Sequence, residues 1–426
     1  MLMIAVISLF TLMFFGVPIT FSLMGSGFLA VALTGEIPMY INAQRFIGGV
    51  NSFTLMAIPL FIIAGAIMNQ GGLSSKIIHF CSTLLSWVRG GVGCVTVASN
   101  MVFGAVSGSG TAAVSAIGSM TAPEMEKMGY EKRFIGAMIA GAASTAPIIP
   151  PSNTMIIFAS ITGMSVASLF MGGFVPGITI GLILMVICHF YAKKHDIDYG
   201  GKFVPKDVLI AFKDCFWALI MPVIIIGGVA SGFCTATEAG AIACVYGLVV
   251  SFFIYKQLKI TDLYRVLRKA AVSTGQVLSL YAASTVYGYI FTVENFGPMF
   301  EKWLLGITDS PIVIMLMICA VMVVIGCFME PVAVMPVMLP IVFPLLQSLG
   351  CNMIQFGIMF SMSVIIGGLT PPVGSYLFVT CSVIKESVIK LIPWMMVMVA
   401  VDIFVILLVI FFEPFATFLP AILGYT

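Results

Sequence analysis

Two stretches of this chain interrupt long apolar segments with a proline pair. Residues 146–153 read APIIPPSN, and residues 367–374 read GGLTPPVG, with 221 positions between the two proline pairs. Proline lacks a backbone N–H and clashes with the preceding helical turn, so each segment is expected to unwind there. In a membrane, unwound backbone is tolerated only where it is buried in protein or lines a cavity. Broken helices in corresponding positions of two halves therefore predict a transporter-like binding site near the membrane midplane.

The composition is that of a polytopic helical membrane protein. Of the 426 residues, 61% are hydrophobic and 8% are charged, whereas soluble chains carry about 25% charged residues. The net charge of +2 favours neither nucleic acid nor an acidic soluble partner, and a lipid bilayer is the expected environment. The ten cysteines lie singly, without a CxxC pair, and are interpreted as small apolar helix residues. Residues 1–15 are expected to form a retained helix, because they lack a basic n-region and an Ala-x-Ala cleavage site.

The apolar segments divide into two similar halves of an all-α protein. They fall at residues 2–15, 17–34, 52–69, 92–122, 134–163, 166–192, 215–232, 236–256, 275–293, 312–346, 354–384 and 391–413. The most polar connection, residues 193–214, includes Asp198 and is expected to join a first repeat, 1–192, to a second, 215–426. An offset near 222 superposes Gly104 on Gly326.

Loop charges predict that these two repeats are inverted relative to each other. Both loops that flank residues 92–122 are basic, so the positive-inside rule places them in the cytoplasm: Lys76, Arg89, Lys127, Lys132 and Arg133. Residues 92–122 are therefore expected to form a re-entrant hairpin with its tip at residues 104–111. The same rule makes a second hairpin, residues 312–346, enter from the outside with its tip near residues 326–331.

The remaining membrane topology follows from the alternation of the loops between the inside and the outside. Residues 134–163 and 354–384 are expected to be broken helices that cross in opposite directions, which leaves both chain termini outside. Residues 38–49 and 261–272 occupy equivalent positions and carry charge. They are interpreted as interfacial helices that lie along the two membrane surfaces.

Each hairpin tip is expected to meet the break of its own half, which brings half-helix ends together at the midplane. Backbone carbonyls and hydroxyls at such ends suit sodium, a hard cation that prefers oxygen ligands. One predicted sodium site consists of Ser107, Gly108, Ser109, Thr111, Ser144 and Thr145. The second consists of Met329, Glu330, Gly367, Thr370 and Val373, mostly through main-chain oxygens. The alternative is that small and hydroxyl residues merely allow tight helix packing.

Substrate contacts are predicted at the same breaks: Ser109, Pro151, Asn153, Pro372 and Ser375. Asn153 could donate to a substrate carboxylate or cap the second half-helix. Glu330 is a carboxylate in an apolar run, which is costly in a membrane, and it could balance sodium charge or hydrogen-bond the hairpin backbone. Glu238 is interpreted as a helix cap, and Asp402 receives no assignment.

The sequence contains no motif that indicates an enzyme or a cofactor. GxxxxGK[ST], HExxH and GxGD are all absent, so an ion gradient is the expected energy source. The three histidines lie near predicted membrane edges, which argues against a proton relay: His79, His189 and His195.

Four of these motifs together resemble a known family. They are the hairpin at residues 104–116, the acidic turn PEMEKMGY at 123–130, the IIPPS break at 148–152 and GCFMEP at 326–331. They resemble the large membrane subunit of TRAP transporters, the tripartite ATP-independent periplasmic family, over essentially the whole chain. The resemblance implies sodium-driven import of an organic acid, such as sialic acid or a C4-dicarboxylate. Import would occur across the bacterial inner membrane by an elevator movement of the hairpin core against a scaffold braced by the interfacial arm helices.

The resemblance also implies two partners, and this sequence departs from the family pattern at two positions. The partners are a small four-helix membrane subunit and a soluble periplasmic binding protein that delivers substrate. Glu330 stands where the family often has Asp, and Asn153-Thr154 stands where many members continue with Ile-Pro. The alternative function is a stand-alone sodium/dicarboxylate symporter of the same superfamily, which needs no binding protein.

Overall fold

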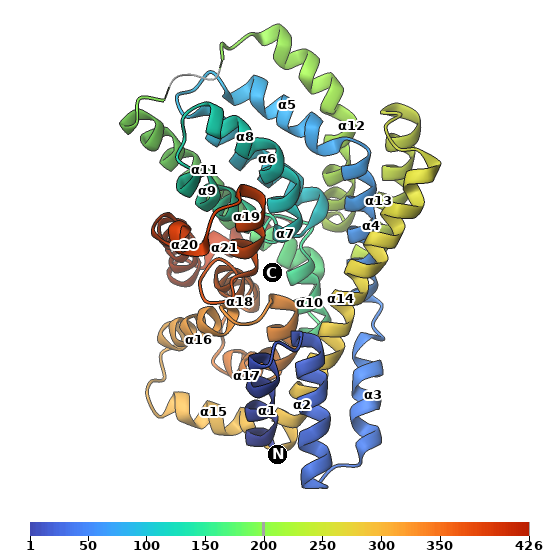
Figure 1. The fold of residues 1–426 in the computed structure, drawn as a ribbon. Coiled ribbons are helices and arrows are strands. Elements are labelled where there is room, and N and C mark those ends of the chain that lie inside the picture. Colours follow the sequence, from blue (N-terminus) through green and yellow to red (C-terminus); the bar gives the residue numbers. More distant parts are fainter. Residues whose placement is uncertain (198–200, 426) are drawn as a thin grey trace.

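The described chain is helical throughout, and helical conformation ends at both proline pairs. The computed structural model describes residues 1–197 and 201–425, and these ranges hold helices, turns and no strand (Figure 1). The first half contains α1 (Leu2–Phe14), α2 (Ile19–Thr34), α3 (Met39–Val50), η1 (Thr54–Met56), α4 (Ala57–Gln70), α5 (Leu73–Leu85), α6 (Gly91–Ser107), α7 (Gly110–Ala113), η2 (Val114–Gly118), α8 (Ser119–Lys127), α9 (Lys132–Ser144), α10 (Asn153–Thr162) and α11 (Val166–Lys194). The second half contains α12 (Pro205–Ala230), α13 (Ala236–Val249), η3 (Val250–Ile254), α14 (Ile260–Val293), α15 (Phe296–Leu305), α16 (Pro311–Gly326), α17 (Pro331–Ser348), α18 (Met353–Gly367), α19 (Ser375–Ile384), α20 (Val388–Phe411) and α21 (Pro414–Ile422).

Several of these helices are long and apolar enough to cross a membrane. Five meet that description within the described residues, and a sixth span results if α3 and the η1–α4 segment, bent by 61°, are taken together. Shorter apolar helices of 10 to 17 residues include α6, α10, α16, α18 and α19, which flank the hairpin tips and the proline breaks. The chain is thus a multi-pass membrane protein that combines full-length helices with half-length ones.

The corresponding elements of the two halves begin at nearly constant spacing. The hairpins begin at residues 91 and 311, and the broken helices at 132 and 353. The half-helices after each proline pair begin at residues 153 and 375. The two proline pairs share one further property, since Pro150-Pro151 and Pro371-Pro372 are both cis.

Both broken helices pack against α20. α9 lies beside α20 with their beginnings together, because the rings of Phe134 and Trp394 are 5.1 Å apart. α18 also packs along α20, but its beginning lies at the end of that helix: the Gln355 amide donates to the carbonyl oxygens of Val409 and Ile410, at 2.8 and 3.0 Å. α9 and α18 therefore run in opposite directions beside the same neighbour.

The structure differs from the expected interfacial helices in the second half. Residues 39–50 do form a separate helix, α3. Residues 261–272, however, are the first turns of the uninterrupted 34-residue helix α14, so a second separate arm helix is not formed. The local reason is that this stretch, TDLYRVLRKAAV, contains neither Gly nor Pro to end a helix.

Other helix boundaries also differ from those expected from the sequence. Three short helices, α5, α15 and α21, had not been expected. α5 was missed because its sequence LSSKIIHFCSTLL is too polar to be recognised as an apolar segment. Of the expected connector 193–214, Lys193 and Lys194 end α11 and residues 205–214 belong to α12. Asp198 in that connector lies outside the described residues.

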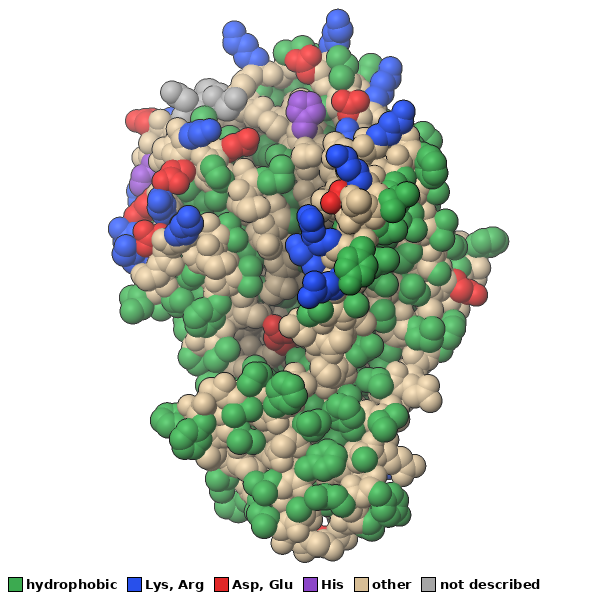
Figure 2. All heavy atoms as spheres, turned by 45° about the vertical axis from the view of Figure 1, so that its right-hand side comes forward, with side chains coloured by type: hydrophobic (Ala, Val, Ile, Leu, Met, Phe, Trp, Pro, Cys, Tyr) green, Lys and Arg blue, Asp and Glu red, His purple; other side chains and the backbone are tan. Residues whose placement is uncertain are grey.

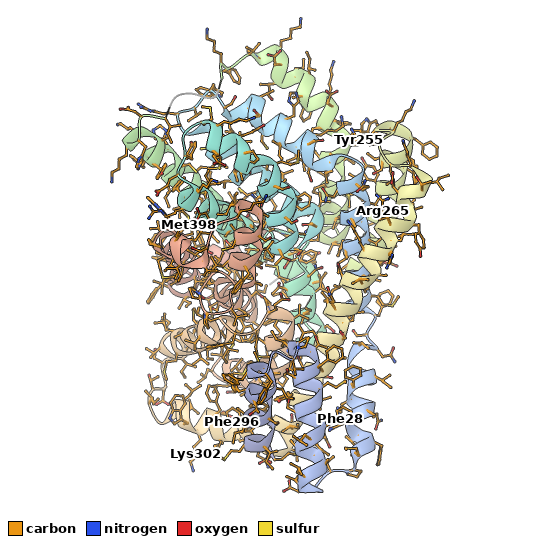
Figure 3. All side chains as sticks on the ribbon, viewed as in Figure 1. Phe28, Tyr255, Arg265, Phe296, Lys302 and Met398 are labelled. Carbon is orange, nitrogen blue, oxygen red and sulfur yellow. The ribbon has the colours of Figure 1, made fainter. Side chains whose placement is uncertain are left out.

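Charged side chains are unevenly spread over the surface. Figure 2 shows Lys and Arg side chains gathered on the upper part of the molecule, whereas the lower part of the same face carries hydrophobic and other uncharged groups. Figure 3 labels Arg265 in the upper half, on α14, and Lys302 near the lower end, on α15. A broad uncharged surface next to a basic end is expected for a protein embedded in a bilayer.

Candidate ion and substrate site

The first hairpin tip packs directly against the first proline break. α6 ends at Ser107, and Gly108 turns the chain with a φ of +61° that favours glycine. A Cβ atom at Gly108 would lie 2.6 Å from the carbonyl oxygen of Pro151, and one at Gly104 would lie 2.5 Å from Cα of Ala146. The two glycines therefore allow backbone-to-backbone contact between hairpin and break.

The predicted residues of the first sodium site form two groups of hydroxyls. At the tip, Ser109 Oγ accepts from the Ala112 N–H at 3.4 Å and lies 3.2 Å from Thr111 Oγ1. At the end of α9, the hydroxyl of Ser144 donates to the Gly141 carbonyl at 2.7 Å, and that of Thr145 donates to the Ala142 carbonyl at 2.6 Å. Because these two hydroxyls donate to carbonyls of their own helix, their oxygen lone pairs can still bind a cation.

The second hairpin tip meets the second break through an equivalent glycine contact. A Cβ atom at Gly367 would lie 2.2 Å from the carbonyl carbon of Gly326. Val373 donates its N–H to the Cys327 carbonyl at 3.1 Å, and Cys327 Sγ lies 2.9 Å from Thr370 Oγ1. Three of the predicted ligands, Gly367, Thr370 and Val373, are thus gathered at the tip.

Cys327 joins this group although sequence reasoning missed it. It had been interpreted as an apolar helix residue, like the other cysteines. The available signal was its place inside the tip sequence GCFMEP.

Glu330 lies at the same tip but is not buried by this chain. It is the residue before α17, its side chain is exposed, and it makes no capping hydrogen bond to that helix. The structure therefore gives no support to the alternative in which Glu330 hydrogen-bonds the hairpin backbone. Met329, next to it, is half-buried.

The residues predicted to contact substrate lie around both breaks. Ser152, not Asn153, caps α10, because its Oγ accepts from the Met155 N–H at 3.2 Å. The capping alternative for Asn153 is therefore wrong, and its buried Oδ1 has no hydrogen-bond partner among the described residues. In the second half, Pro372 is exposed and Ser375 begins α19.

Tyr376 connects the second break to the first hairpin tip and was missed by sequence reasoning. A Cβ atom at Gly110, in the first hairpin, would lie 2.7 Å from the Tyr376 ring of α19. This contact brings the tip of one half against the second half-helix of the other. α10 likewise packs against α17 of the second hairpin, so each broken helix reaches the opposite hairpin.

Glu238 and Asp402 make different kinds of contact. Glu238 is confirmed as a helix cap: its carboxylate accepts from the N–H and the hydroxyl of Thr235, both at 2.8 Å. Asp402, for which no role was predicted, lies in α20, and its Oδ1 is 3.3 Å from the hydroxyl oxygen of Ser144. It therefore touches a predicted sodium ligand, a relation that no sequence spacing reveals because 258 positions separate the two residues.

The comparisons with known proteins decide the family. Residues 6–414 match the family described as "Tripartite ATP-independent periplasmic transporter, DctM component". The chain belongs to the DctM family.

Curated relatives of this DctM-family chain are themselves permeases. It is 38% identical over 370 residues to a putative TRAP transporter large permease protein of Haemophilus influenzae, and the match covers 87% of each chain. It is 30% identical to the sialic acid TRAP transporter large permease protein SiaM of Vibrio cholerae, with 97% of each chain covered.

A third relative is longer than this chain. The isethionate TRAP transporter permease protein DctMQ of Oleidesulfovibrio alaskensis is 35% identical over 410 residues, which cover 96% of this chain but 63% of that protein. The chain thus spans about two thirds of its length.

One solved structure supports the fold of the DctM-family chain. The YdaH transporter of Alcanivorax borkumensis superposes with a TM-score of 0.59 over 89% of this chain and 88% of that one, at 11% sequence identity. This likeness concerns the fold alone.

Proposed function

We propose that this chain is the large permease subunit of a sodium-coupled TRAP transporter that imports an organic acid across the bacterial inner membrane. The observation that carries the proposal is the paired contact of hairpin tips with proline breaks, at Gly108–Pro151 and Gly326–Gly367, in a member of the DctM family. Both contacts gather backbone and hydroxyl oxygens where two half-helices end. Such sites suit a small hard cation and a carboxylate bound side by side.

Several features support two inverted repeats. α9 and α18 run in opposite directions beside α20, and equivalent elements begin 220 to 222 positions apart, at residues 91 and 311, 132 and 353, and 153 and 375. Each broken helix also packs on the hairpin of the other half. An inverted pair of this kind presents equivalent gates to the two sides of the membrane, which alternating access requires.

An elevator movement is the transport mechanism that we infer for this arrangement. α4 and α14 pack together and contact the two hairpins at glycines: Gly65 lies against Ser107, and a Cβ at Gly288 would lie 2.6 Å from the Pro336 carbonyl oxygen. Smooth glycine faces allow one packed unit to slide past another without interlocked side chains. The hairpins and broken helices would move, and α4 with α14 would belong to the scaffold.

Two partners complete the proposed transporter. They are a small four-helix membrane subunit and a periplasmic binding protein that delivers the substrate. The isethionate relative, a permease protein named DctMQ, extends beyond the 63% of its length that matches this chain, which supports a further membrane component in the transporter. The relatives' names support an organic anion as substrate, isethionate in one case and sialic acid in another.

Uptake into proteoliposomes tests this function. The vesicles would hold this chain and its small subunit, and radiolabelled sialic acid, isethionate and succinate would be offered with and without binding protein. We expect uptake of one class of anion that requires both an inward sodium gradient and the binding protein. Uptake without binding protein would favour the stand-alone symporter instead, and uptake indifferent to sodium would refute the proposed coupling.

A further inference from the structure

Asp402 is a buried carboxylate with little of its hydrogen-bonding capacity used. Its side chain is 1% exposed, in the middle of α20. Oδ1 lies 3.3 Å from Ser144 Oγ, whose single proton has a closer acceptor in the Gly141 carbonyl at 2.7 Å, and Oδ2 has no hydrogen-bond partner among residues 1–197 and 201–425. No ion pair within those ranges includes Asp402. A charged carboxylate in such a place is strongly unfavourable unless a cation accompanies it.

The surroundings of Asp402 add further negative character. Ser144 is the last residue of α9, so it lies at the negative end of the dipole of that helix. Thr145, the next residue, is fully buried. The region therefore combines one carboxylate, two hydroxyl oxygens and a helix C-terminus, all of which attract a cation.

Close packing of α9 on α20 holds these groups together. A Cβ atom at Gly136 would lie 2.7 Å from the Leu391 side chain, and one at Gly141 would lie 2.8 Å from the Met398 side chain. Met398, which Figure 3 labels, precedes Asp402 by one helical turn, and Gly141 precedes Ser144 by about one turn. The position of Asp402 beside the end of α9 is thus determined by small residues along the whole contact.

The distance between the two oxygens also suits a shared cation. Ser144 Oγ and Asp402 Oδ1 are 3.3 Å apart, longer than the usual O–H···O distance of about 2.7–2.8 Å. Two oxygens that each bind one small hard cation at about 2.4 Å, at right angles, lie about 3.4 Å apart. The pair is therefore spaced as two ligands of one ion would be.

We propose that one coupling sodium ion binds between α9 and α20, with Asp402 as its carboxylate ligand and Ser144 as a neutral ligand. This inference rests on the proposed sodium-coupled function. It differs from the site expected from the sequence by giving the first ion a negatively charged ligand, supplied by the second half of the chain. The ion would then neutralise a buried charge each time it binds.

The test uses the reconstituted complex with Asp402→Asn. Asparagine keeps an oxygen that can accept from Ser144, so the contact between α9 and α20 is retained while the charge is removed. Glu386→Gln is the matched control, because Glu386 lies in the turn before α20, half-exposed, and pairs with Lys390 at 2.9 Å. That hydrogen bond to Lys390 lowers the pKa of Glu386, which keeps this carboxylate charged and compensated.

Two readouts would be compared: melting temperature against sodium concentration, and uptake against sodium concentration. For Asp402→Asn we expect a melting temperature in sodium-free buffer at or above that of wild type, because an uncompensated charge is gone. We also expect at least a tenfold higher half-saturating sodium concentration and a lower Hill coefficient for uptake. Glu386→Gln is expected to match wild type in both assays.

The outcomes separate this inference from the proposed function. Failure of wild type to respond to sodium would refute the sodium-coupled function itself. A sodium response in wild type that Asp402→Asn leaves unchanged would refute only the Asp402 site. A variant that melts lower without sodium yet titrates normally would assign Asp402 a purely structural role, and one that changes only the pH dependence of uptake would assign it a proton instead of sodium.

Discussion

Replacing Gly367 with alanine is expected to separate the second hairpin tip from the second break. The added Cβ would lie 2.2 and 2.3 Å from two backbone carbons of Gly326 and 2.7 Å from the Cys327 nitrogen. Ordinary van der Waals contact begins at 3.4 Å, so the tip must move by at least 1.2 Å. All three neighbours are backbone atoms, which cannot avoid the methyl group by changing rotamer.

The structure sets the size of the effect. Overpacking of this kind costs about 1–3 kcal/mol. The hydrogen bond from Val373 to Cys327, 3.1 Å long, would also be lost or lengthened, for about 0.5–1.5 kcal/mol. The sum is about 1.5–4.5 kcal/mol, and because the tip geometry assembles the predicted second sodium site, we expect sodium affinity there to fall by about 10- to 2000-fold.

The assay is a sodium titration of melting temperature and uptake for Gly367→Ala, with Gly275→Ala as the control. Gly275 lies in α14 with open space around it, so a methyl group meets nothing within 4 Å and alanine should stabilise the helix slightly. Wild-type sodium affinity in Gly367→Ala would show that the tip is not an ion site. A change of equal size in the control would point to a general effect of losing glycine.

Three further predictions concern other contacts. Gly288→Val places a branched side chain against the Pro336 carbonyl, and we expect uptake to be lost while sodium still raises the melting temperature; loss of both responses would mean misfolding instead. Ser152→Ala removes the cap of α10, and unfolding in denaturant should show about 1 kcal/mol less stability, whereas Ser75→Ala at an exposed position should change little. Ser109→Ala is expected to raise the half-saturating substrate or sodium concentration in uptake, with a loss of stability in sodium-free buffer no larger than that of a lost helix cap, about 1 kcal/mol, because Ser109 also accepts from the Ala112 N–H; unchanged uptake would remove Ser109 from the site.

The sequence by itself determined the class of protein and the location of its breaks. An apolar composition requires helices in a bilayer, and a proline pair removes a donor and ends a helix regardless of what surrounds it. For this reason the ends of α9, α10, α18 and α19 lie within a few residues of the expected boundaries. The motifs that resemble the family could also be recognised from the sequence, because the tips and breaks are short contiguous stretches.

Boundaries predicted from the local sequence were less accurate where no Gly or Pro ends a helix. Residues 261–272 were expected to form a separate interfacial helix. They are the first turns of α14, because this stretch has no Gly or Pro that would end the helix. Glu330 was interpreted as a costly carboxylate in an apolar run, to be balanced by sodium or by hydrogen bonds to the hairpin backbone, whereas its side chain is exposed. Its exposure instead depends on which other segments cover the tip, and within this chain none covers it fully.

Only the tertiary structure decided which distant residues share a site. Asp402 meets Ser144 because glycines at 136 and 141 let α20 approach α9, and Tyr376 meets Gly110 because α19 crosses to the other half. Such contacts join residues more than 250 positions apart, and helix packing, not chain spacing, sets them. A helix pattern records which side of a helix is apolar, but it does not identify the neighbour that will cover that side.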